Sequence, residues 1–585
     1  MSAPGCSGTR EARARRASWW PWLGLLAALG CVSTPPLTEP ATTIYVARQI
    51  LTMDPEQPTA EAVAVADGRI VGVGDLSSLR NDLRQHSQVL VDMRFAEKTL
   101  LPGLIDNHIH PMMAAVLLPM EFVTPYDWDL PDRQVIGVRG QDAYRARLAE
   151  LEASHPEGEP LFAWGYHPIF HGELARRDLN QISTTRPIIV WHRSFHEIYL
   201  NDAAMRWMEL ERRDWRRHPH VDWARGHFYE TGLAAVVAKL NPTILSPEWI
   251  SKGLRLVIAA AHQGGVTTIA DMATGIFDLD RELEVMPAFL GRADVPFRTL
   301  LIPAAGPLTL VMGPAPAFDR VASLPQPASA KVEIADQVKF LADGAFYSQL
   351  MQMGDGYLDG HHGEWLMTPE QLLAGMRPFW HGEYQLHIHV NGDLGVKSAL
   401  DALDTLQAEK PRDDHRTTLH HFGYSKDAQS RRIADAGVLV SANPFYVYAL
   451  ADPYSEVGLG PERASHMVRL GSLARAGVPI SLHSDFTMAP LEPLRLAWVA
   501  ANRTTADGVV HAPDERLSVD HALRAVTIDA AHAIQMEDEV GSIRVGKRAD
   551  FTVLEEDPTA VPPERLADIP IWGTVFEGTP HPRAN

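Results

Sequence analysis

The stretch Leu100-Leu101-Pro102-Gly103-Leu104-Ile105-Asp106-Asn107-His108-Ile109-His110 decides the fold and the chemistry of this chain. It is an apolar run that ends in polar residues, a pattern typical of a buried strand reaching its C-terminal edge. Residues two apart on a strand point the same way, so the imidazoles of His108 and His110 project side by side. Two adjacent neutral imidazoles are a good start for a divalent metal site.

The composition is that of an ordinary globular enzyme with an acidic surface. The chain has 585 residues, which is too long for one simple core and predicts two or three structural units. Hydrophobic residues make up 45%, charged residues 22%, and the net charge is −20. Because phosphate binding needs a basic face, we expect no nucleic-acid partner. A small-molecule substrate is expected, and a homo-oligomer is left open.

The first 31 residues predict an export signal. Four arginines between residues 10 and 16 precede an apolar run, Trp19 to Gly30, that is too short to favour a membrane-spanning helix. Ala28-Leu29-Gly30-Cys31 resembles the cleavage site of a bacterial lipoprotein. We therefore expect residues 1–31 to be a signal peptide, with lipid on Cys31 as an anchor, and the protein to be secreted or periplasmic. Plain cleavage nearby and an uncleaved anchor are the alternatives.

Only two cysteines are present, Cys6 and Cys31, and both lie in the leader. The remainder of the chain therefore has no disulfide framework and no thiolate metal ligands. Residues 32–42 are rich in Pro and Thr and are typical of a linker.

Short strands with tight turns are expected at both ends of the remaining chain. Residues 43–98 include a hairpin pattern that turns at Asp67-Gly68, and residues 535–585 repeat the strand-turn-strand pattern. We expect the two ends to build one small β-sandwich domain.

The central region, 99–534, alternates apolar runs with amphipathic helical segments, which predicts an α/β fold with a parallel sheet. Strands are expected at 188–191, 266–270, 337–341, 386–390, 417–419, 438–440 and 479–482. More than six such units favour a closed (β/α)8 TIM barrel over an open sheet. Residues from about 115 to 250 exceed what one β-α step needs, and we expect them to be an insertion that covers the barrel mouth.

Further ligand-type residues stand near the ends of the later apolar runs: Lys339, His389, His421 and Asp485. Each alone is more often structural, Lys339 as a paired or snorkelling residue and Asp485 as a turn residue or helix N-cap. Adjacent strand residues face opposite ways, so at most one of His420 and His421 should point into the barrel. Together with the two first histidines they predict a ring at the C-terminal face, where barrel enzymes work.

The lysine has a sharper interpretation within such a ring. A desolvated amine with a depressed pKa can react with carbon dioxide. The resulting carbamate on Lys339 acts as a carboxylate that bridges two metal ions.

The chain resembles the metal-dependent amidohydrolase superfamily, and within it the YtcJ-like branch, amidohydrolase family 3. The resemblance covers nearly everything after the leader, in motifs at 101–110, 186–196, 338–344, 388–393, 419–421 and 483–485. Four positions depart from the family pattern. His420 stands where Glu is common, His483 stands where Gly is common, and Phe486-Thr487 replaces Ala-Pro.

The resemblance implies a hydrolase with one or two divalent ions, Zn most readily. His108, His110 and Asp485 would hold one ion, and His389 and His421 the second, with carboxylated Lys339 bridging. Asp485 would also be the catalytic proton carrier. Asp106 would orient the ring of His108. His196, Tyr166 and Tyr347 are weaker candidates for contacting substrate, and each is equally well an ordinary pocket-wall or core residue.

The expected reaction is hydrolysis of a carbon–nitrogen bond other than a peptide bond: an amide, formamide or cyclic amide. One alternative is an esterase, decarboxylase or isomerase built on a similar barrel. Another is a non-catalytic barrel that binds a ligand. The sequence does not name the substrate.

Overall fold

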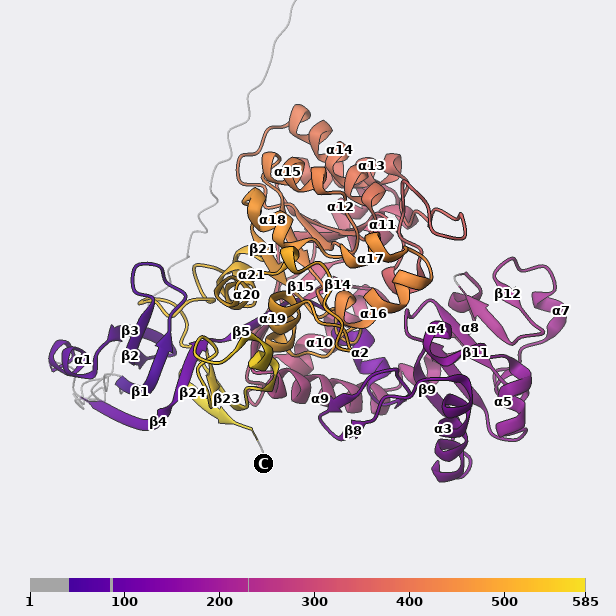
Figure 1. Cartoon of the computed structure of the whole chain (residues 1–585), viewed down its shortest axis with the longest axis horizontal. Coiled ribbons are helices and arrows are strands. Elements are labelled where there is room, and N and C mark those ends of the chain that lie inside the picture. The colour runs from indigo at the N-terminus through magenta and orange to yellow at the C-terminus, as the bar shows by residue number, and fades with distance from the viewer. Residues whose placement is uncertain (1–41, 85–87, 230, 584–585) are drawn as a thin grey trace, which may run out of the picture. The chain divides into compact units, whose positions relative to one another are not determined.

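Parallel strands and helices alternate through the centre of the computed structural model, which describes residues 42–84, 88–229 and 231–583 (Figure 1). The expected signal peptide and Cys31 lie outside these residues, as does the expected linker up to residue 41. Thr42 already belongs to the first strand. Within the described ranges, no helix combines the length and apolar character needed to cross a membrane.

The central strands form two parallel sheets, in the orders β16-β15-β14-β5 and β17-β18-β19-β20-β21. A parallel bridge between Ile109 and Phe486 joins the end of β5 to the segment after β21. Every residue of β14 is buried, as is typical of a parallel strand that is covered on both faces. The strands are β5 (Leu104–Ile109), β14 (Val266–Thr274), β15 (Arg298–Pro303), β16 (Val332–Ile334), β17 (Gln337–Leu341), β18 (Gln385–Val390), β19 (Thr418–His421), β20 (Leu439–Ala442) and β21 (Ile480–Leu482).

Helices connect and cover these strands, so the predicted α/β fold is confirmed. The helices are α2 (Pro111–Leu117), α9 (Pro247–Gln263), α10 (Leu279–Leu290), α11 (Ala305–Met312), α12 (Pro314–Ala322), α13 (Pro369–His381), α14 (Asp393–Glu409), α15 (Asp427–Asp435), α16 (Phe445–Glu456), α17 (Pro461–Ser465), α18 (Leu470–Ala476), α19 (Pro493–Asn502), α20 (Val519–Ala525) and α21 (Ile528–Ala533). Short 3-10 helices cover Phe346–Ser348, Pro513–Glu515 and Pro563–Asp568.

Both ends of the described chain meet in one seven-stranded sheet, ordered β24-β23-β22-β4-β1-β2-β3. Figure 1 shows its early strands in indigo and its late strands in yellow. Phe95 packs against Tyr45 and, edge-on, against Trp572, so one core joins the two chain ends. Its elements are β1 (Thr42–Leu51), β2 (Thr59–Ala66), β3 (Arg69–Gly74), α1 (Leu76–Asp82), β4 (Val89–Pro102), β22 (Phe551–Leu554), β23 (Ile571–Phe576) and β24 (Thr579–Pro582).

This terminal sheet leads directly into the first central strand, because β4 passes through Gly103 into β5. A Cβ at Gly103 would lie 1.9 Å from Thr267 Oγ1, so only glycine fits. The Gly103 N–H donates to Asp550 O (2.8 Å), and β22 pairs with β4. The C-terminal strands therefore hold the strand that carries His108.

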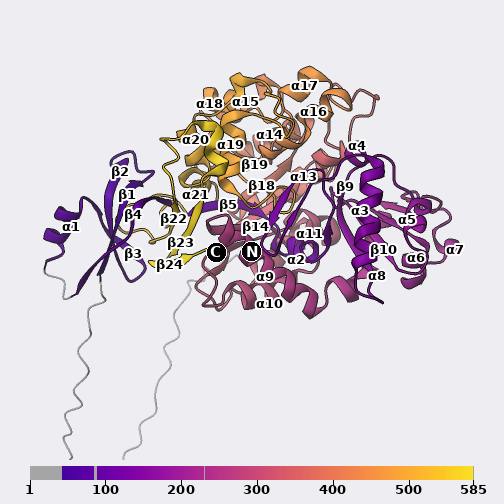
Figure 2. The ribbon, with the colours of Figure 1, turned by 60° about the horizontal axis from the view of Figure 1, so that its bottom comes forward.

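A separate six-stranded sheet, ordered β12-β13-β11-β10-β9-β6, occupies the long connection between β5 and β14 (Figure 2). The helices and strands of this connection, including a separate hairpin of β7 and β8, are β6 (Glu121–Phe122), β7 (Trp128–Leu130), β8 (Arg133–Val135), α3 (Gln141–Ser154), β9 (Leu161–Tyr166), α4 (Pro168–His171), α5 (Arg176–Ile182), β10 (Ile188–His192), β11 (Glu197–Leu200), α6 (Asp202–Trp207), α7 (Arg212–Trp215), β12 (Val221–Asp222), β13 (His227–Tyr229) and α8 (Thr231–Ile244). We call residues 121–244 the inserted segment.

Candidate metal centre

The two histidines at the end of β5 meet Asp485, which follows β21. His110 Nε2 lies 3.3 Å from His108 Nε2 and 3.2 Å from Asp485 Oδ1, and His108 Nε2 lies 3.7 Å from the same oxygen. The backbone brings them together, because the Asp485 N–H donates to His108 O (3.0 Å). Residues 375 positions apart thus converge on one point, and they form a group able to hold a metal ion.

His421, at the end of β19, stands on the other side of Asp485. Its Nδ1 lies 3.6 Å from Asp485 Oδ2 and 3.4 Å from His483 Nε2. A tetrahedral ion with Zn–N bonds of about 2.0–2.1 Å spaces its ligand atoms roughly 3.3–3.4 Å apart. The separations of 3.2–3.7 Å among these side chains fit that geometry. The donor set of imidazoles and one carboxylate also suits a divalent ion such as Zn²⁺.

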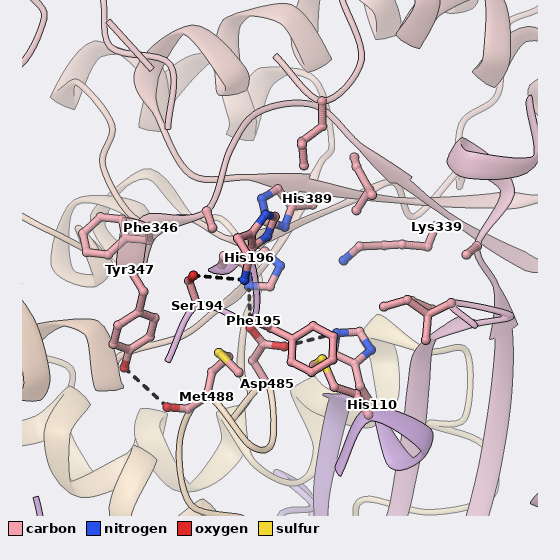
Figure 3. Close-up of a pocket in the computed structure, with 18 of the residues that line it drawn as sticks. His110, Ser194, Phe195, His196, Lys339, Phe346, Tyr347, His389, Asp485 and Met488 are labelled. Carbon is pink, nitrogen blue, oxygen red and sulfur yellow. Dashed lines mark hydrogen bonds and ion pairs between the residues drawn. The ribbon is translucent and has the colours of Figure 1, made fainter. Parts of the chain in front are cut away.

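Lys339 on β17 is buried, and its Nζ has no hydrogen-bond partner among the described residues. Figure 3 shows the amine pointing into the space between His389 and His110. Burial lowers the pKa of Lys339 well below its ordinary value and so favours the neutral form of the amine. A buried amine without a partner is costly, which indicates that a further group satisfies it.

His389, at the end of β18, lines the same cavity and lies beside His421, with ring centroids 4.4 Å apart. Its Nε2 accepts a hydrogen bond from Asn391 Nδ2 (3.0 Å). The carboxylate of Asp343 fixes the end of this strand, since it accepts from the N–H groups of Asn391 (2.8 Å) and Gly392 (2.7 Å).

His420 and His421 both face the interior, contrary to the expectation that at most one would. His421 has φ of 71°, so the strict alternation of a strand ends there. His420 Nδ1 lies 2.8 Å from His108 Nδ1, and its Nε2 lies 2.8 Å from His387 Nδ1. Both nitrogens of His420 therefore support other rings.

This row of imidazoles ends at Gln337. The Gln337 amide Nε2 donates to Ile534 O (2.9 Å), so its Oε1, 2.8 Å from His387 Nε2, accepts from that ring. His387 Nδ1 then accepts from His420, and His420 Nδ1 accepts from His108 Nδ1–H. The lone pair of His108 Nε2 is left facing His110 and Asp485. We call Gln337, His387 and His420 the imidazole relay.

The expectation that Asp106 orients the ring of His108 is wrong. Its carboxylate accepts instead from the backbone N–H groups of His108 (3.3 Å) and Ser484 (3.2 Å), and it therefore ties the ends of β5 and β21. The relay takes the role expected of Asp106, because it contacts the ring nitrogen.

Burial decides the charge of most of these rings. It lowers the pKa of His108, His421 and His483 well below the ordinary value, and that of His389 to about 3. They are therefore neutral, which is the form in which an imidazole binds a metal ion. For His110, burial opposes the charge, but the carboxylates of Asp271 and Asp485 outweigh it and raise the pKa to about 9. Position 110 thus attracts positive charge.

The candidate ligands open into a cavity of about 460 Å³ with a largely apolar wall. Apolar side chains that line it include Met113, Phe195, Leu233, Ile276, Phe277 and Phe346. Among its described lining residues none is an arginine or a glutamate, and the only lysine is Lys339.

Two of the three weaker candidates for substrate contact lie in the cavity wall, and the third does not. His196 and Tyr347 line the cavity. Tyr166 does not: it is buried in the inserted segment, and its hydroxyl donates to Gly172 O (2.7 Å). The expected substrate contact of Tyr166 is therefore not supported. Sequence reasoning gave no role to His483, although its place two residues before Asp485 on an extended segment was a usable signal.

Comparison with known proteins decides the family. The sequence profile of the amidohydrolase family matches residues 96–581. The chain belongs to the amidohydrolase family. It is accordingly a metal-dependent hydrolase acting on carbon–nitrogen bonds, and the resemblance to the family 3 branch is confirmed.

Two curated relatives span nearly the whole amidohydrolase chain. N-substituted formamide deformylase of Arthrobacter pascens is 24% identical over 561 residues, covering 93% of this chain and 98% of that protein. The putative amidohydrolase YtcJ of Bacillus subtilis (strain 168) is 24% identical over 546 residues, covering 90% and 97%. An uncharacterized metal-dependent hydrolase from Pyrococcus horikoshii OT3 superposes with a TM-score of 0.68 at 20% identity, covering 89% of this chain and 99% of that one. This likeness shows the fold.

Proposed function

We propose that this amidohydrolase cleaves an amide, formamide or cyclic amide that carries an apolar, uncharged substituent. The observation that carries the proposal is the convergence of His108, His110 and Asp485, with donor atoms 3.2–3.7 Å apart, at the base of an apolar cavity. The A. pascens relative, named for N-substituted formamides, agrees with this substrate class.

We infer that the central strands close into a (β/α)8 barrel, residues 99–534, with the segment at about 115–250 inserted. The Ile109–Phe486 bridge between the two parallel sheets supports closure on one side. With the order β5, β14, β15, β17, β18, β19, β20, β21, the candidate ligands would gather at the C-terminal ends of the strands, except Lys339, which lies in the middle of β17. Residues 43–98 and 535–585 form the second domain in this proposal.

The ligand assignment follows the same geometry. His108, His110 and Asp485 would hold one divalent ion, and His389 and His421 would hold a second, with carboxylated Lys339 as a ligand of both. Zn²⁺ is the first choice, because imidazole and carboxylate without thiolate suit it. Such an ion lowers the pKa of a bound water and polarises the substrate carbonyl.

Asp485 moves the proton in this proposal. Its carboxylate lines the cavity and lies beside His108, His110 and His421. It is therefore next to the position that the attacking water would occupy. It accepts the proton of that water and returns it to the leaving nitrogen, which needs a proton to depart as an amine.

Lys339 is the site of carbamate formation. The neutral Nζ attacks the carbon of carbon dioxide, a new N–C bond forms, and one proton is released to solvent. The carbamate would replace an unpartnered buried amine by an anion, which divalent ions held by the neighbouring histidines would stabilise. Carbamate formation would therefore remove the cost of an unpartnered buried amine and would also supply the bridging carboxylate.

The cavity wall argues for the substrate class. Among the described lining residues, a carboxylate or phosphate on the substrate would meet no arginine, and a cation would meet no glutamate. An aryl or alkyl substituent would instead replace water against Phe195, Phe277 and Phe346.

Metal analysis together with a substrate panel tests the function. We expect bound divalent metal, loss of activity with a chelator, and preference for N-aryl or N-alkyl formamides and amides over the corresponding esters and over charged analogues. Protein that holds no metal contradicts the centre. Metal-loaded protein that cleaves only esters, or nothing on a broad panel, overturns the C–N assignment.

We also propose that residues 1–31 direct export and that Cys31 carries a lipid. The basic and apolar segments before Cys31 support this. Membrane fractionation of cells that express wild-type or Cys31→Ser protein tests it. We expect the wild type with membranes and the variant in the soluble periplasmic fraction, and identical distributions would contradict lipidation.

A further inference from the structure

His483 lies beneath the candidate metal centre, fully buried, directly after β21. Its ring stacks on His108, with centroids 4.4 Å apart and an interplanar angle of 25°. It shares with His108 and His421 a group of nitrogens close enough to hold one ion.

Hydrogen bonds on the far side assign the proton of this ring. Asn107 Nδ2 donates to Ser481 Oγ (2.9 Å), which turns Asn107 Oδ1 toward Ser441. The Ser441 hydroxyl donates to that oxygen (2.9 Å), so its own oxygen is free to accept. His483 Nδ1, 2.9 Å from Ser441 Oγ, must therefore carry the proton, and Nε2 carries the lone pair.

The distance from Nε2 to its neighbour separates two roles for the ring. The imidazole contacts of the relay, from His108 to His420 and from His420 to His387, are both 2.8 Å, which is ordinary hydrogen-bond length. His483 Nε2 and His421 Nδ1 are 3.4 Å apart. That is long for a hydrogen bond and equals the roughly 3.3–3.4 Å spacing of two nitrogens on one tetrahedral ion.

We propose that His483 is a further metal ligand, through Nε2, for the ion that His421 would hold. The inference rests on the proposed metal centre and adds to it a nitrogen from the segment directly after β21. His420, equally buried, is excluded because both of its nitrogens are engaged in the relay. A centre with this extra imidazole favours Zn²⁺, Co²⁺, Ni²⁺ or Cu²⁺ over Mn²⁺ or Mg²⁺.

His483→Asn is the sharpest test, because the Asn amide nitrogen takes the position of Nδ1 and keeps the bond to Ser441 while Nε2 is lost. His415→Asn is the matched control. His415 is buried and has both nitrogens engaged, by Thr417 Oγ1 and Ala436 O, away from the cavity. Wild type and both variants are compared for metal content, for metal affinity by chelator competition, and for the visible spectrum of the Co²⁺-substituted protein.

We expect metal affinity in His483→Asn to fall by about 100-fold or more, the upper end of what supporting residues contribute. Its Co²⁺ spectrum should change, and His415→Asn should match wild type. Wild-type affinity and spectrum in His483→Asn overturn the inference and leave the centre intact. Metal-free wild type instead removes the centre itself.

His483→Gly covers the case in which His483→Asn does not fold. It leaves a space the size of the ring, and free imidazole should restore the Co²⁺ spectrum. A spectrum in His483→Gly that already equals wild type, or that imidazole leaves unchanged, would also overturn the ligand role.

Discussion

The strand ends of the central sheets and the inserted segment meet at the same cavity but contribute different chemistry. The strand ends supply titratable groups whose backbones are cross-tied, as by the carboxylate of Asp106 between His108 and Ser484. The inserted segment supplies Ser194, Phe195, His196 and apolar residues of α8. The difference indicates that the inserted segment contributes to substrate choice without supplying a candidate metal ligand.

The two parts should accordingly fail differently when altered. Changes at the strand ends should reduce kcat or metal affinity for every substrate. Changes in the inserted segment should alter KM for some substrates and leave the metal in place.

The largest effect is expected from Asp485→Asn. Asn keeps the shape but is a poor proton acceptor, so kcat should fall by roughly 10²–10⁴-fold, the usual contribution of a positioned acid-base group. Steady-state kinetics on the best amide substrate, with thermal unfolding as a check of folding, measures this. A purified variant with near-normal kcat would remove Asp485 from the mechanism.

Lys339→Ala should lose activity by roughly 100-fold, the upper range for a group that tunes a metal centre. Acetate or propionate should restore part of the rate, because a carboxylate fits the space of the missing carbamate. Lys397→Ala, an exposed lysine on α14 paired with Asp401, is the control and should not respond. Full activity and metal content in Lys339→Ala would exclude the bridging role.

Gln337→Leu tests the imidazole relay at its far end. Without the Gln337 oxygen, His387 loses its fixed tautomer, and His108 then presents a lone pair at Nε2 in only part of the molecules. Metal affinity should weaken by about 10-fold, as for other residues that orient ligands. Gln429→Leu, on α15 and outside the cavity, is the control. Equal metal affinity in both variants would mean that the relay only fills space.

The smallest change is expected from Phe195→Ala in the inserted segment. Phe195 lines the cavity and stacks on Trp191, with centroids 4.6 Å apart. Losing about 1.4 kcal/mol of apolar contact should raise KM for N-aryl substrates about 10-fold, with kcat nearly unchanged. Trp207→Ala, partly exposed on α6, is the control. A fall in kcat for all substrates would contradict the separation of roles.

The convergence of the proposed ligand residues was predictable from the sequence, because all but Lys339 stand at or just after the end of an apolar run, and strand ends share one edge of a parallel sheet. Local backbone changes were not predictable. The positive φ of His421 turns both His420 and His421 inward. The rule that neighbouring side chains alternate assumes a regular extended backbone at both residues. The contact between Asp106 and backbone N–H groups likewise depends on how β21 meets β5.

The apolar wall was harder still to predict. Phe195 lies in a loop between β10 and β11, and Leu233 and Val237 lie on α8, so no periodicity marks them as neighbours. Tyr166 illustrates the opposite case, in which a residue predicted to contact substrate lies away from the cavity. Its hydroxyl donates instead to Gly172 O inside the inserted segment.

The pairing of β22 with β4 has a consequence for biogenesis. The strand bearing the first two histidines continues from β4, whose neighbour β22 (Phe551–Leu554) comes about 450 residues later in the chain. A chain that emerges from its N-terminus therefore cannot complete this pairing until residues 551–554 have been synthesised. Loss of the strands β22 to β24 would expose a β-sheet edge and leave β5, which carries His108, without the support of β22.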